Sequence, residues 1–499
     1  MNNPTGPSKE GTALQLMQDS IYLYTQEAYL WNDQLPSYAK FNPRSFTNSD
    51  PKAALDKELD ALSQYAINPN TNKPYEYYPN SPGLAKYSFV DDGTEGDALN
   101  GIKGDFGFDY NYNQVDDIRV LYAYPGSPAG KAGITRGCQI LSINDDSDIS
   151  YDGLFSDGTK SGTGTSVHNN FVYNAIFQSS GTIKMTIKRL NGTTFTANLS
   201  AVTYNVDPIL KDTVMDAGVG HKIGYLVFNS FVSDDVADSK LDAAFADFTS
   251  KGVTDLVIDL RYNGGGYVST AEYLDNLIVP PSKTGVMYKT YYNSTLTAGK
   301  EKILKNQVFR DNNGLYTLAD YIDQEVANNS VNFAKKGSLN VGRVFFIVTG
   351  GTASASELTI NNLRPQMDVQ LVGETSYGKP VGFFGIDINK YTLYTPEFST
   401  KNSAGQGDYY AGMTPGDPDY PGVNDLDDYT KDFGDPTEKL LAHIFSKVKT
   451  NAYNTTNKVT QSTSNNGKSF SLLQSREKTL FLNKNKFTGM ILKKSKVKR

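Results

Sequence analysis

The sequence predicts a multidomain α/β protein with a helical N-terminal segment, a β-rich second region and a mostly parallel α/β core. Three observations predict this class. From residue 221 onward, apolar β-favouring runs alternate with amphipathic helical patterns, which is typical of a parallel sheet covered by helices. Residues 103–206 instead contain short strands of alternating polarity with frequent Gly, Asn and Asp. Residues 13–102 begin with apolar side chains at helical spacing.

The N-terminal region is expected to be a flexible lead over residues 1–12 and a helical domain over residues 13–102. One helix is predicted from Ala13 to Leu30, and a second begins at Pro51, because proline is favoured at the first helical position. The start, MNNPTGPSKEG, lacks the apolar stretch of a signal peptide. Either the protein is cytoplasmic or an export segment has been removed, and we carry the second explanation forward.

Composition narrows the classes of function. A net charge of −6 argues against binding to nucleic acid through phosphate contacts. The single cysteine, Cys138, excludes an intrachain disulfide, so cysteine pairing does not reveal the compartment. No apolar run reaches the roughly 20 residues that a membrane-spanning helix needs. We therefore expect no nucleic-acid partner and no transmembrane segment.

The stretch between Val344 and Lys379 contains the strongest candidate for a catalytic site. Val344 to Val348 predicts a strand buried on both faces, two glycines then permit a sharp turn, and Ser354 to Leu363 favours a helix. A strand, a tight turn and a helix would hold the Ser354 hydroxyl at a fixed point. The N–H of Ala355, unpaired at the start of the helix, would face an oxyanion as it develops.

A nucleophilic serine needs a base, and Lys379 follows 25 residues after Ser354. It comes after a second predicted strand, Val369 to Val372, and a turn that contains glycine. If this strand lies parallel to and beside the first one, Lys379 returns to the same end of the sheet as Ser354.

Three motifs, GTASASE, LVGETSYGK and the upstream DLRYNGGG, resemble those of the C-terminal processing (tail-specific) peptidases, which use a Ser-Lys pair. The resemblance extends from about Gly104 to Phe445. It implies that Ser354 rather than Ser356 is the nucleophile and that Lys379 is the base. It also implies that Glu357 supports the lysine, as an acidic residue does in some members.

The same resemblance implies a crotonase-like catalytic core over residues 207–446. DLRYNGGG would supply the second oxyanion donor from the amide of Gly265 or Gly266, and which of the two acts stays open. Asp259, Arg261 and Asn263 are expected to hold this turn rather than to catalyse. No metal and no cofactor is implied.

Structural roles would explain the same residues differently. A serine at a helix start is commonly a cap, and a lysine after a glycine is usually a solvated charge. A carboxylate three residues after a serine can complete a capping box, which explains Glu357 equally well. A Ser-His-Asp triad would have to use His168, His221 or His443, of which His221 is the nearest candidate. The combined motifs favour the serine–lysine pair.

Residues 103–206 resemble a PDZ domain, a module that can bind a peptide as an added strand and hold its terminal carboxylate on backbone amides. Phe106, Gly107 and Phe108 lie where the carboxylate-binding loop would be. Cys138 stands where the family often has Asp, so the turn there is expected to differ. The alternative is an interdomain spacer without peptide affinity.

Two further regions have no motif. Residues 281–342 either wall the substrate groove or elaborate the surface. Residues 447–499 are predicted to be a linker and a basic tail, with seven basic residues between Lys484 and Arg499. A solvated tail is expected there, and contact with an anionic membrane surface is the alternative.

The sequence thus predicts a serine endopeptidase that acts on unstructured or C-terminal regions of polypeptides through an acyl-enzyme. The rival hypothesis is an inactive binding protein that presents polypeptides or an apolar ligand to a partner. The resemblance implies a location in the periplasm or cell envelope, with a lipid anchor on the full-length precursor. The oligomeric state is not predicted.

Overall fold

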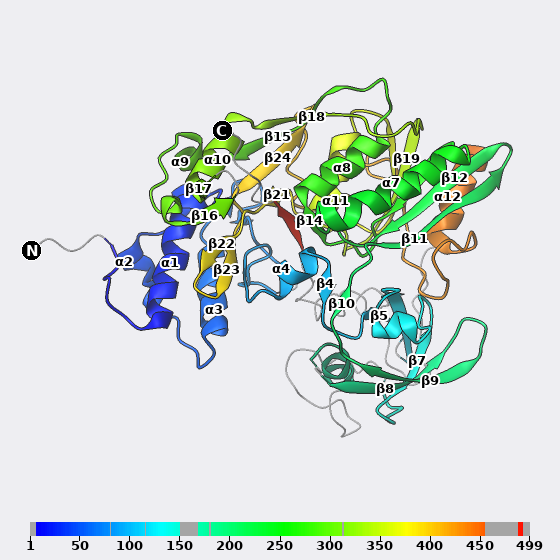
Figure 1. Ribbon diagram of the computed structural model, residues 1–499, viewed down its shortest axis with the longest axis horizontal. Helices are drawn as coiled ribbons and strands as arrows, with labels where there is room; N and C mark the ends of the chain where they lie inside the picture. The colour runs from blue at the N-terminus through cyan, green and yellow to red at the C-terminus, as the bar shows by residue number, and fades with distance from the viewer. Residues whose placement is uncertain are drawn as a thin grey trace, which may run out of the picture.

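The structure is a computed structural model that describes residues 6–79, 81–114, 116–149, 168–178, 181–311, 314–454 and 488–492. Three regions are visible in Figure 1: N-terminal helices at the left, a large α/β region at the upper right, and a separate β-rich region below it. The predicted mixed α/β multidomain fold is therefore confirmed. In the described residues, no helix is long and apolar enough to cross a membrane.

A six-stranded sheet forms the centre of the α/β region. Its strand order is β11-β12-β13-β19-β20-β25, and only the β11–β12 pair is antiparallel. The strands have these bounds: Ile209–Gly218 (β11), His221–Phe228 (β12), Asp255–Asp259 (β13), Arg343–Val348 (β19), Asp368–Gly373 (β20) and Gly422–Asn424 (β25). β13 is buried along its whole length, and β19 from Val344 onward. The prediction of a mostly parallel sheet is confirmed.

Helices cover this sheet where the sequence predicts them. The helix α8 packs against both α7 and α11, and α12 packs against β11 and β20. Their bounds are Asp234–Ser250 (α7), Val268–Ile278 (α8), Ala355–Leu363 (α11) and Lys439–Thr450 (α12). The apolar face of α7, with Leu241, Phe245 and Phe248, is buried.

The N-terminal helices share a core with later parts of the chain. The helix α1 (Ala13–Ala28) begins at a Thr12–Gln15 capping box, and α3 (Pro51–Ser63) begins at Asp50, so both predicted helices are present. Their apolar faces join one cluster with α10 (Leu318–Ala327) and with residues 384–393. A strand of this region, β3 (Phe89–Asp91), also pairs with β23 (Tyr391–Tyr394). Residues 13–102 therefore bury their apolar surface against the α/β region.

The β-rich region is a five-stranded antiparallel sheet with a core of its own. The strands are β5 (Phe108–Gln114), β6 (Asp117–Ala123), β7 (Gln139–Ile143), β8 (Thr182–Lys188) and β9 (Thr194–Ser200). The chain enters and leaves it side by side, because β4 (Ile102–Lys103) pairs with β10 (Tyr204–Asn205). Residues 150–167, between β7 and α6, lie outside the described residues.

A second sheet, in the order β18-β15-β24-β21, joins residues 281–342 to the chain after Lys379. Its strands are β18 (Ser330–Phe333), β15 (Gly285–Tyr292), β24 (Phe398–Asn402) and β21 (Val381–Gly382). A hairpin also follows Lys379, in which β22 (Ile386–Ile388) pairs with β23. The remaining short elements are η1 (Asn32–Gln34), α2 (Tyr38–Phe41), η2 (Pro43–Ser45), β1 (Ile67–Asn68), β2 (Lys73–Pro74), α4 (Thr94–Leu99), α5 (Pro128–Lys131), α6 (His168–Tyr173), η3 (Asn174–Gln178), α9 (Ser294–Thr297), η4 (Leu304–Asn306), β16 (Val308–Asp311) and β17 (Gly314–Thr317).

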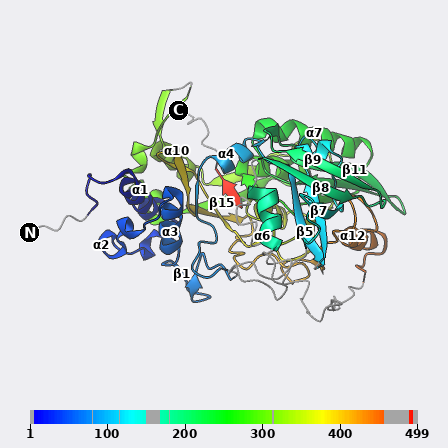
Figure 2. The ribbon, with the colours of Figure 1, turned by 90° about the horizontal axis from the view of Figure 1, so that it is seen from below.

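One part of the predicted linker and tail differs from the expectation. Residues 488–492 lie inside the protein, where β26 (Gly489–Ile491) pairs in parallel with β14 (Gly265–Tyr267). In Figure 1 this short red strand lies beside β14 at the centre of the molecule, and it is also visible near the middle of Figure 2. The prediction of a solvated tail is wrong for this segment, because Met490 and Ile491 are apolar and bury their side chains.

Candidate active site

Ser354 lies on a strained turn between β19 and α11. Its backbone has φ 61° and ψ −107°, a conformation that costs energy for any residue other than glycine. Thr352 supports the turn, because its hydroxyl donates to the Leu260 carbonyl at 2.8 Å. Ser354 is fully buried, and its Oγ has no hydrogen-bond partner among the described residues. The fold therefore holds a free hydroxyl at a fixed point, as the motif predicts.

Ser356, the other serine of the motif, is used differently. Its Oγ donates to the Asn263 carbonyl at 2.9 Å and so ties the start of α11 to the loop after β13. A hydroxyl engaged in this way holds the two loops together. The two serines therefore differ, because only the Ser356 hydroxyl donates to a backbone carbonyl.

Lys379 follows β20, which lies parallel to and beside β19. The side chain is fully buried, and Nζ lies 3.8 Å from the centre of the Phe383 ring. Burial lowers the pKa of Lys379 well below its usual range, and the nearby Glu76 and Glu357 offset only part of this effect. Nζ donates to the carbonyl of Thr488. A lysine in this environment can be neutral and so can accept a proton.

Glu357 joins the serine turn to the lysine turn. Its Oε2 accepts the N–H of Ser354 at 2.9 Å and the N–H of Lys379 at 2.8 Å. Its Oε1 accepts the Ser376 hydroxyl at 2.5 Å and the Gly378 N–H at 2.7 Å. Burial raises the pKa of this carboxyl, while these four bonds lower it again in part. One carboxylate oxygen therefore sets the separation of the two backbones.

This arrangement changes the predicted role of Glu357. Its carboxylate accepts hydrogen bonds from backbone amides and from the Ser376 hydroxyl, whereas Lys379 Nζ bonds to the Thr488 carbonyl. Glu357 is therefore a positioning residue, and its effect on Lys379 Nζ is a charge effect across space. The capping-box explanation covers only the bond to Ser354, since the bonds to the lysine turn lie outside any helix cap.

The start of α11 lies against the glycine turn that follows β13. Ala355 is the first residue of α11, so its N–H has no acceptor within the helix. Gly265 lies against it, since a Cβ at Gly265 would be only 3.0 Å from Ala355 N. Both Gly265 (φ 107°) and Gly266 (φ 141°) have positive φ angles that favour glycine.

The two glycine amides differ in their bonding. The Gly265 N–H donates to Asn263 Oδ1 at 2.9 Å, and this bond holds the turn. Gly266 remains as the candidate. These two glycines also form the strand β14, where the sequence predicts only a turn before α8.

The other polar residues of DLRYNGGG hold the loop, as predicted. Arg261 pairs with Asp259 at 2.8 Å, and Asn263 Nδ2 donates to the Phe228 carbonyl at 2.8 Å. Arg261 also bonds to Asp427, which pairs with Arg136 of the β-rich region at 2.7 Å. The sequence did not predict this ionic link between the two regions, because its partners are far apart in the chain.

The N-terminal region supplies residues that the sequence analysis missed. Lys86 Nζ donates to the carbonyls of Gly378 at 3.1 Å and Tyr410 at 3.2 Å, and burial lowers its pKa to about 8. The Tyr87 hydroxyl donates to the same Gly378 carbonyl at 2.6 Å. These residues hold the turn before Lys379 from the opposite side to Glu357. The only signal for them was the density of tyrosines in residues 75–87.

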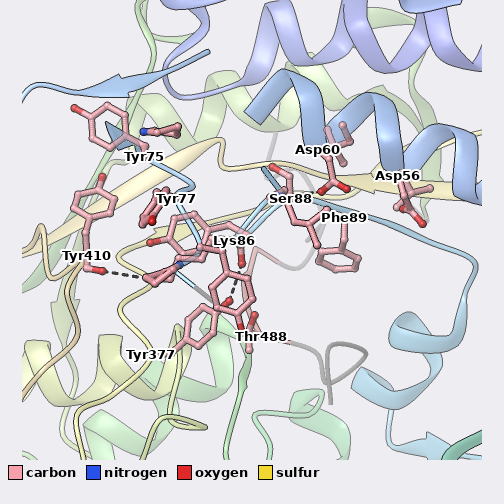
Figure 3. Close-up of a pocket in the computed structure, with 18 of the residues that line it drawn as sticks. Asp56, Asp60, Tyr75, Tyr77, Lys86, Ser88, Phe89, Tyr377, Tyr410 and Thr488 are labelled. Atoms are coloured by element: carbon pink, nitrogen blue, oxygen red, sulfur yellow. Dashed lines mark hydrogen bonds between the residues drawn. The ribbon is translucent and has the colours of Figure 1, made fainter. Parts of the chain in front are cut away.

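A pocket of about 1400 Å³ opens beside this turn. Figure 3 shows Lys86, Tyr377, Tyr410 and Thr488 together on its wall. Gly350 and Gly351 of the serine turn also line it, and most of the remaining lining comes from residues 50–95. No lining residue of this pocket belongs to residues 281–342, so that region does not wall it.

The two histidines whose side chains the structure describes, His221 and His443, are both paired with aspartates. His221 begins β12 and lies 3.1 Å from Asp255, which begins β13, so both are at the amino ends of their strands. Ser354 follows the carboxyl end of β19, at the opposite edge of the same sheet. His443 lies 3.0 Å from Asp425. The side chain of His168 lies outside the described residues.

The loop predicted to bind a peptide carboxylate is tightly packed. Phe106 and Phe108 are buried, and Gly107 has a φ of 80°. The Gly107 carbonyl accepts the Tyr124 N–H at 2.9 Å, and the Phe106 carbonyl accepts the Ala129 N–H at 3.0 Å. A Cβ at Gly107 would lie 2.0 Å from Ser127 Cβ, so only glycine fits there. The loop therefore has a fixed backbone.

A strained serine at a strand-to-helix turn, a buried lysine on the next parallel strand and two amides beside them are the parts of a serine–lysine hydrolase site. Comparison with known proteins agrees with this class. Residues 222–407 match Peptidase family S41. The resemblance to the C-terminal processing peptidases, predicted from the three motifs, is confirmed.

Curated relatives include two proteases of Bacillus subtilis (strain 168). The carboxy-terminal processing protease CtpA is 25% identical over 263 residues, which cover 53% of this chain and 44% of the relative. CtpB is 24% identical over 334 residues, which cover 66% of this chain and 55% of the relative. The chain thus spans about half the length of these relatives.

A solved structure from Bacteroides fragilis NCTC 9343, described as an S41 protease, shares the fold. The TM-score is 0.53 at 21% sequence identity, and the alignment covers 86% of this chain and 97% of the other.

Proposed function

We propose that the protein is a serine endopeptidase that cleaves polypeptides through a Ser354–Lys379 pair. One observation carries this proposal: a single oxygen of Glu357 accepts the amides of both residues, which fixes a free serine hydroxyl and a buried lysine in one site. The match to Peptidase family S41 supports the same conclusion.

Lys379 acts as the base in the proposed reaction. Its lowered pKa leaves a neutral amine, which takes the proton of the Ser354 hydroxyl as Oγ attacks the scissile carbonyl carbon. The amides of Ala355 and Gly266 then stabilise the negative oxygen. Lys379 returns its proton to the leaving amine, and water hydrolyses the acyl-enzyme by the same steps.

The substrates are proposed to be extended segments of polypeptide, including C-terminal ends. The pocket beside the lysine turn is lined by several tyrosines together with acidic and basic side chains, so it offers both apolar and polar contacts to an extended chain. Residues 103–206 are proposed to be a PDZ domain that binds substrate ends at Phe106, Gly107 and Phe108, and residues 207–446 a crotonase-like catalytic domain. The antiparallel sheet and the rigid Gly107 loop support the PDZ assignment.

The rival hypothesis of an inactive binding protein has no observation in its favour. A binding protein would not need the strained φ of Ser354 or a buried lysine whose backbone amide shares an acceptor with that of Ser354.

Cleavage by matched serine variants tests the proposal. The parent should cut an unstructured protein substrate, with the cut ends mapped by mass spectrometry, and Ser354→Ala should cut nothing while it keeps the parent's circular dichroism spectrum. Ser356→Ala should keep measurable activity, because its Oγ only ties two loops together. Activity in Ser354→Ala would overturn the proposal.

The PDZ assignment has its own test. A peptide with a free, apolar C-terminus should be cut faster than its amidated twin, because amidation removes the carboxylate that backbone amides would hold. Equal rates would favour a spacer role for residues 103–206.

The location is proposed to be the periplasm or cell envelope, with a lipid anchor on the full-length precursor. Cell fractionation of the natural producer tests this, and recovery in the cytoplasm would contradict it.

A further inference from the structure

The segment Thr488–Leu492 lies in the active site as an added strand. On one side, Gly489 N–H donates to the Gly264 carbonyl at 3.0 Å, and the segment pairs with β14 in parallel. On the other side, Phe383 N–H donates to the Met490 carbonyl at 2.7 Å, and Leu492 N–H donates to the Phe383 carbonyl at 2.9 Å. The segment is therefore bonded on both edges, in the way that proteins bind extended peptides.

The register brings one carbonyl of this segment to the proposed oxyanion site. Gly265 is opposite Gly489, and Gly266 is opposite Met490. Gly489 donates to Gly264, and in a parallel ladder its carbonyl then faces the amide two residues further on, which is that of Gly266. A Cβ at Gly265 would lie 2.2 Å from the Gly489 oxygen and 3.0 Å from Ala355 N. The Gly489 carbonyl thus lies beside both candidate amides.

The residues on either side of Gly489 also meet the site. The Thr488 carbonyl accepts a hydrogen bond from Lys379 Nζ, so the proposed base lies against the segment just before Gly489. After Gly489, Met490 is fully buried in the main core, and Ile491 packs in a cluster with Phe383 and Tyr394. A segment that only filled space would not need its carbonyls aligned with both the lysine and the amides.

We propose that Thr488–Leu492 is an intramolecular substrate, and that the enzyme cleaves its own Gly489–Met490 bond. This inference rests on the proposed peptidase function and names one substrate of that site. The tethered segment competes at an effective concentration of roughly millimolar, so the uncut chain excludes other substrates from the site. Cleavage removes the strand after Gly489 and opens the site to substrates in trans.

The chemistry is that of the proposed reaction. Ser354 Oγ forms a bond to the Gly489 carbonyl carbon while its proton passes to neutral Lys379. The bond from Gly489 to the Met490 nitrogen then breaks, and Lys379 gives the proton to that nitrogen. Water hydrolyses the Gly489 ester on Ser354, which leaves a carboxylate on Gly489 and a new amino terminus on Met490.

Intact-mass measurement of the full chain tests the inference. The parent, incubated after purification, should lose everything after Gly489, and the released fragment should begin at Met490. The fraction cut per hour should stay constant over a tenfold dilution, because the reaction is intramolecular. Ser354→Ala should stay intact under the same conditions.

A second variant separates docking from catalysis. Met490→Asp places a charge in a fully buried position, so the segment should leave the site and stay uncut. This variant should cut an unstructured substrate in trans at least as fast as the uncut parent. Leu190→Asp, a change at an exposed apolar residue of the β-rich region, should be processed like the parent and is the matched control.

Three outcomes would overturn the inference: a parent that stays intact, a cut at another bond, or a rate that falls with dilution. Trans cleavage by Met490→Asp then tells whether the peptidase function itself survives. If that variant cuts the added substrate while the parent stays intact, only the self-cleavage is wrong. If it cuts nothing, the proposed function fails as well.

Discussion

The two ends of the central sheet both gather charged side chains, but they differ in burial and pairing. At the amino ends of the strands, Asp255 bonds to His221 at 3.1 Å and to Arg343 Nε at 2.9 Å, and the His221 side chain is 40% exposed. At the carboxyl ends, Ser354, Glu357 and Lys379 are fully buried. There the Ser354 hydroxyl has no partner among the described residues.

The difference indicates which end carries the chemistry. At the amino ends, Asp255 is paired with both His221 and Arg343. A buried lysine has a lowered pKa, and an unbonded hydroxyl is available to react. The predictions below compare matched changes at the two ends, from the largest expected effect to the smallest.

Replacing the base should have the largest effect. Lys379→Arg should lower kcat by roughly 10³-fold or more, because arginine stays protonated and cannot accept the Ser354 proton. His221→Ala, at the other end of the sheet, should leave kcat unchanged. Peptide-cleavage kinetics measure both variants, and a strong loss in His221→Ala would move the chemistry to the amino end.

Glu357→Gln should have an intermediate effect. The carboxamide has one oxygen where the carboxylate offers two, so one pair of bonds, to Ser354 and Lys379 or to Ser376 and Gly378, is lost. Because small displacements of reacting groups are costly, kcat should fall by roughly 10²-fold. The control is Glu301→Gln, a buried carboxylate outside the site, which should keep the parent kcat. Parent-like kinetics for Glu357→Gln would contradict the positioning role.

Removing the charge of Lys86 should shift the pH dependence. In the proposed mechanism neutral Lys379 is the active form, so activity should rise with pH through its lowered pKa. The charge of Lys86 contributes to that lowering, so Lys86→Gln should raise the pKa of Lys379 and move the rise to higher pH. Lys335→Gln is the matched control, because burial also lowers the pKa of Lys335 to about 8, but its Nζ bonds to Leu277. A pH profile of kcat measures the shift, and an unmoved profile in Lys86→Gln would contradict the coupling.

Asp255→Asn should affect stability alone. The change weakens buried bonds to Arg343 and His221, so the free energy of unfolding should fall by about 1–3 kcal/mol. Urea denaturation measures this loss, and kcat should stay at the parent value. A fall in kcat without loss of stability would show that the amino end takes part in the reaction.

Local sequence patterns predicted most of the α/β core and the strand, tight turn and helix around Ser354. The sequence shows the apolar run Val344 to Val348, the glycines after it and the 25-residue spacing to Lys379. In the structure these features correspond to β19, the turn that follows it and the next parallel strand. The placing of Ser354 and Lys379 at one end of the sheet follows from parallel pairing. Such patterns are visible in a sequence because the residues that favour a strand, turn or helix lie within that same element.

The remaining features depend on contacts between distant segments. Lys86 meets Gly378 and Tyr410 across about 300 residues of chain, and no periodicity predicts such a contact. Which of the three consecutive glycines bonds to Asn263 depends on the orientation of the Asn263 side chain, and the sequence does not show this orientation. Thr488–Leu492 lies within a region rich in polar and basic residues, and this composition favours exposure to solvent. The burial of Met490 and Ile491 depends on pairing with β14, which is more than 200 residues away in the chain.

Labelling with a small phosphonylating reagent tests the central claim most directly. Peptide mapping of the parent should find the adduct on Ser354, and the labelling rate should rise with pH through the lowered pKa of Lys379. His221→Ala should label like the parent, and Lys379→Arg should not label at any pH tested. An adduct on another residue, or labelling of Lys379→Arg at the parent rate, would contradict a serine activated by a neutral, buried lysine.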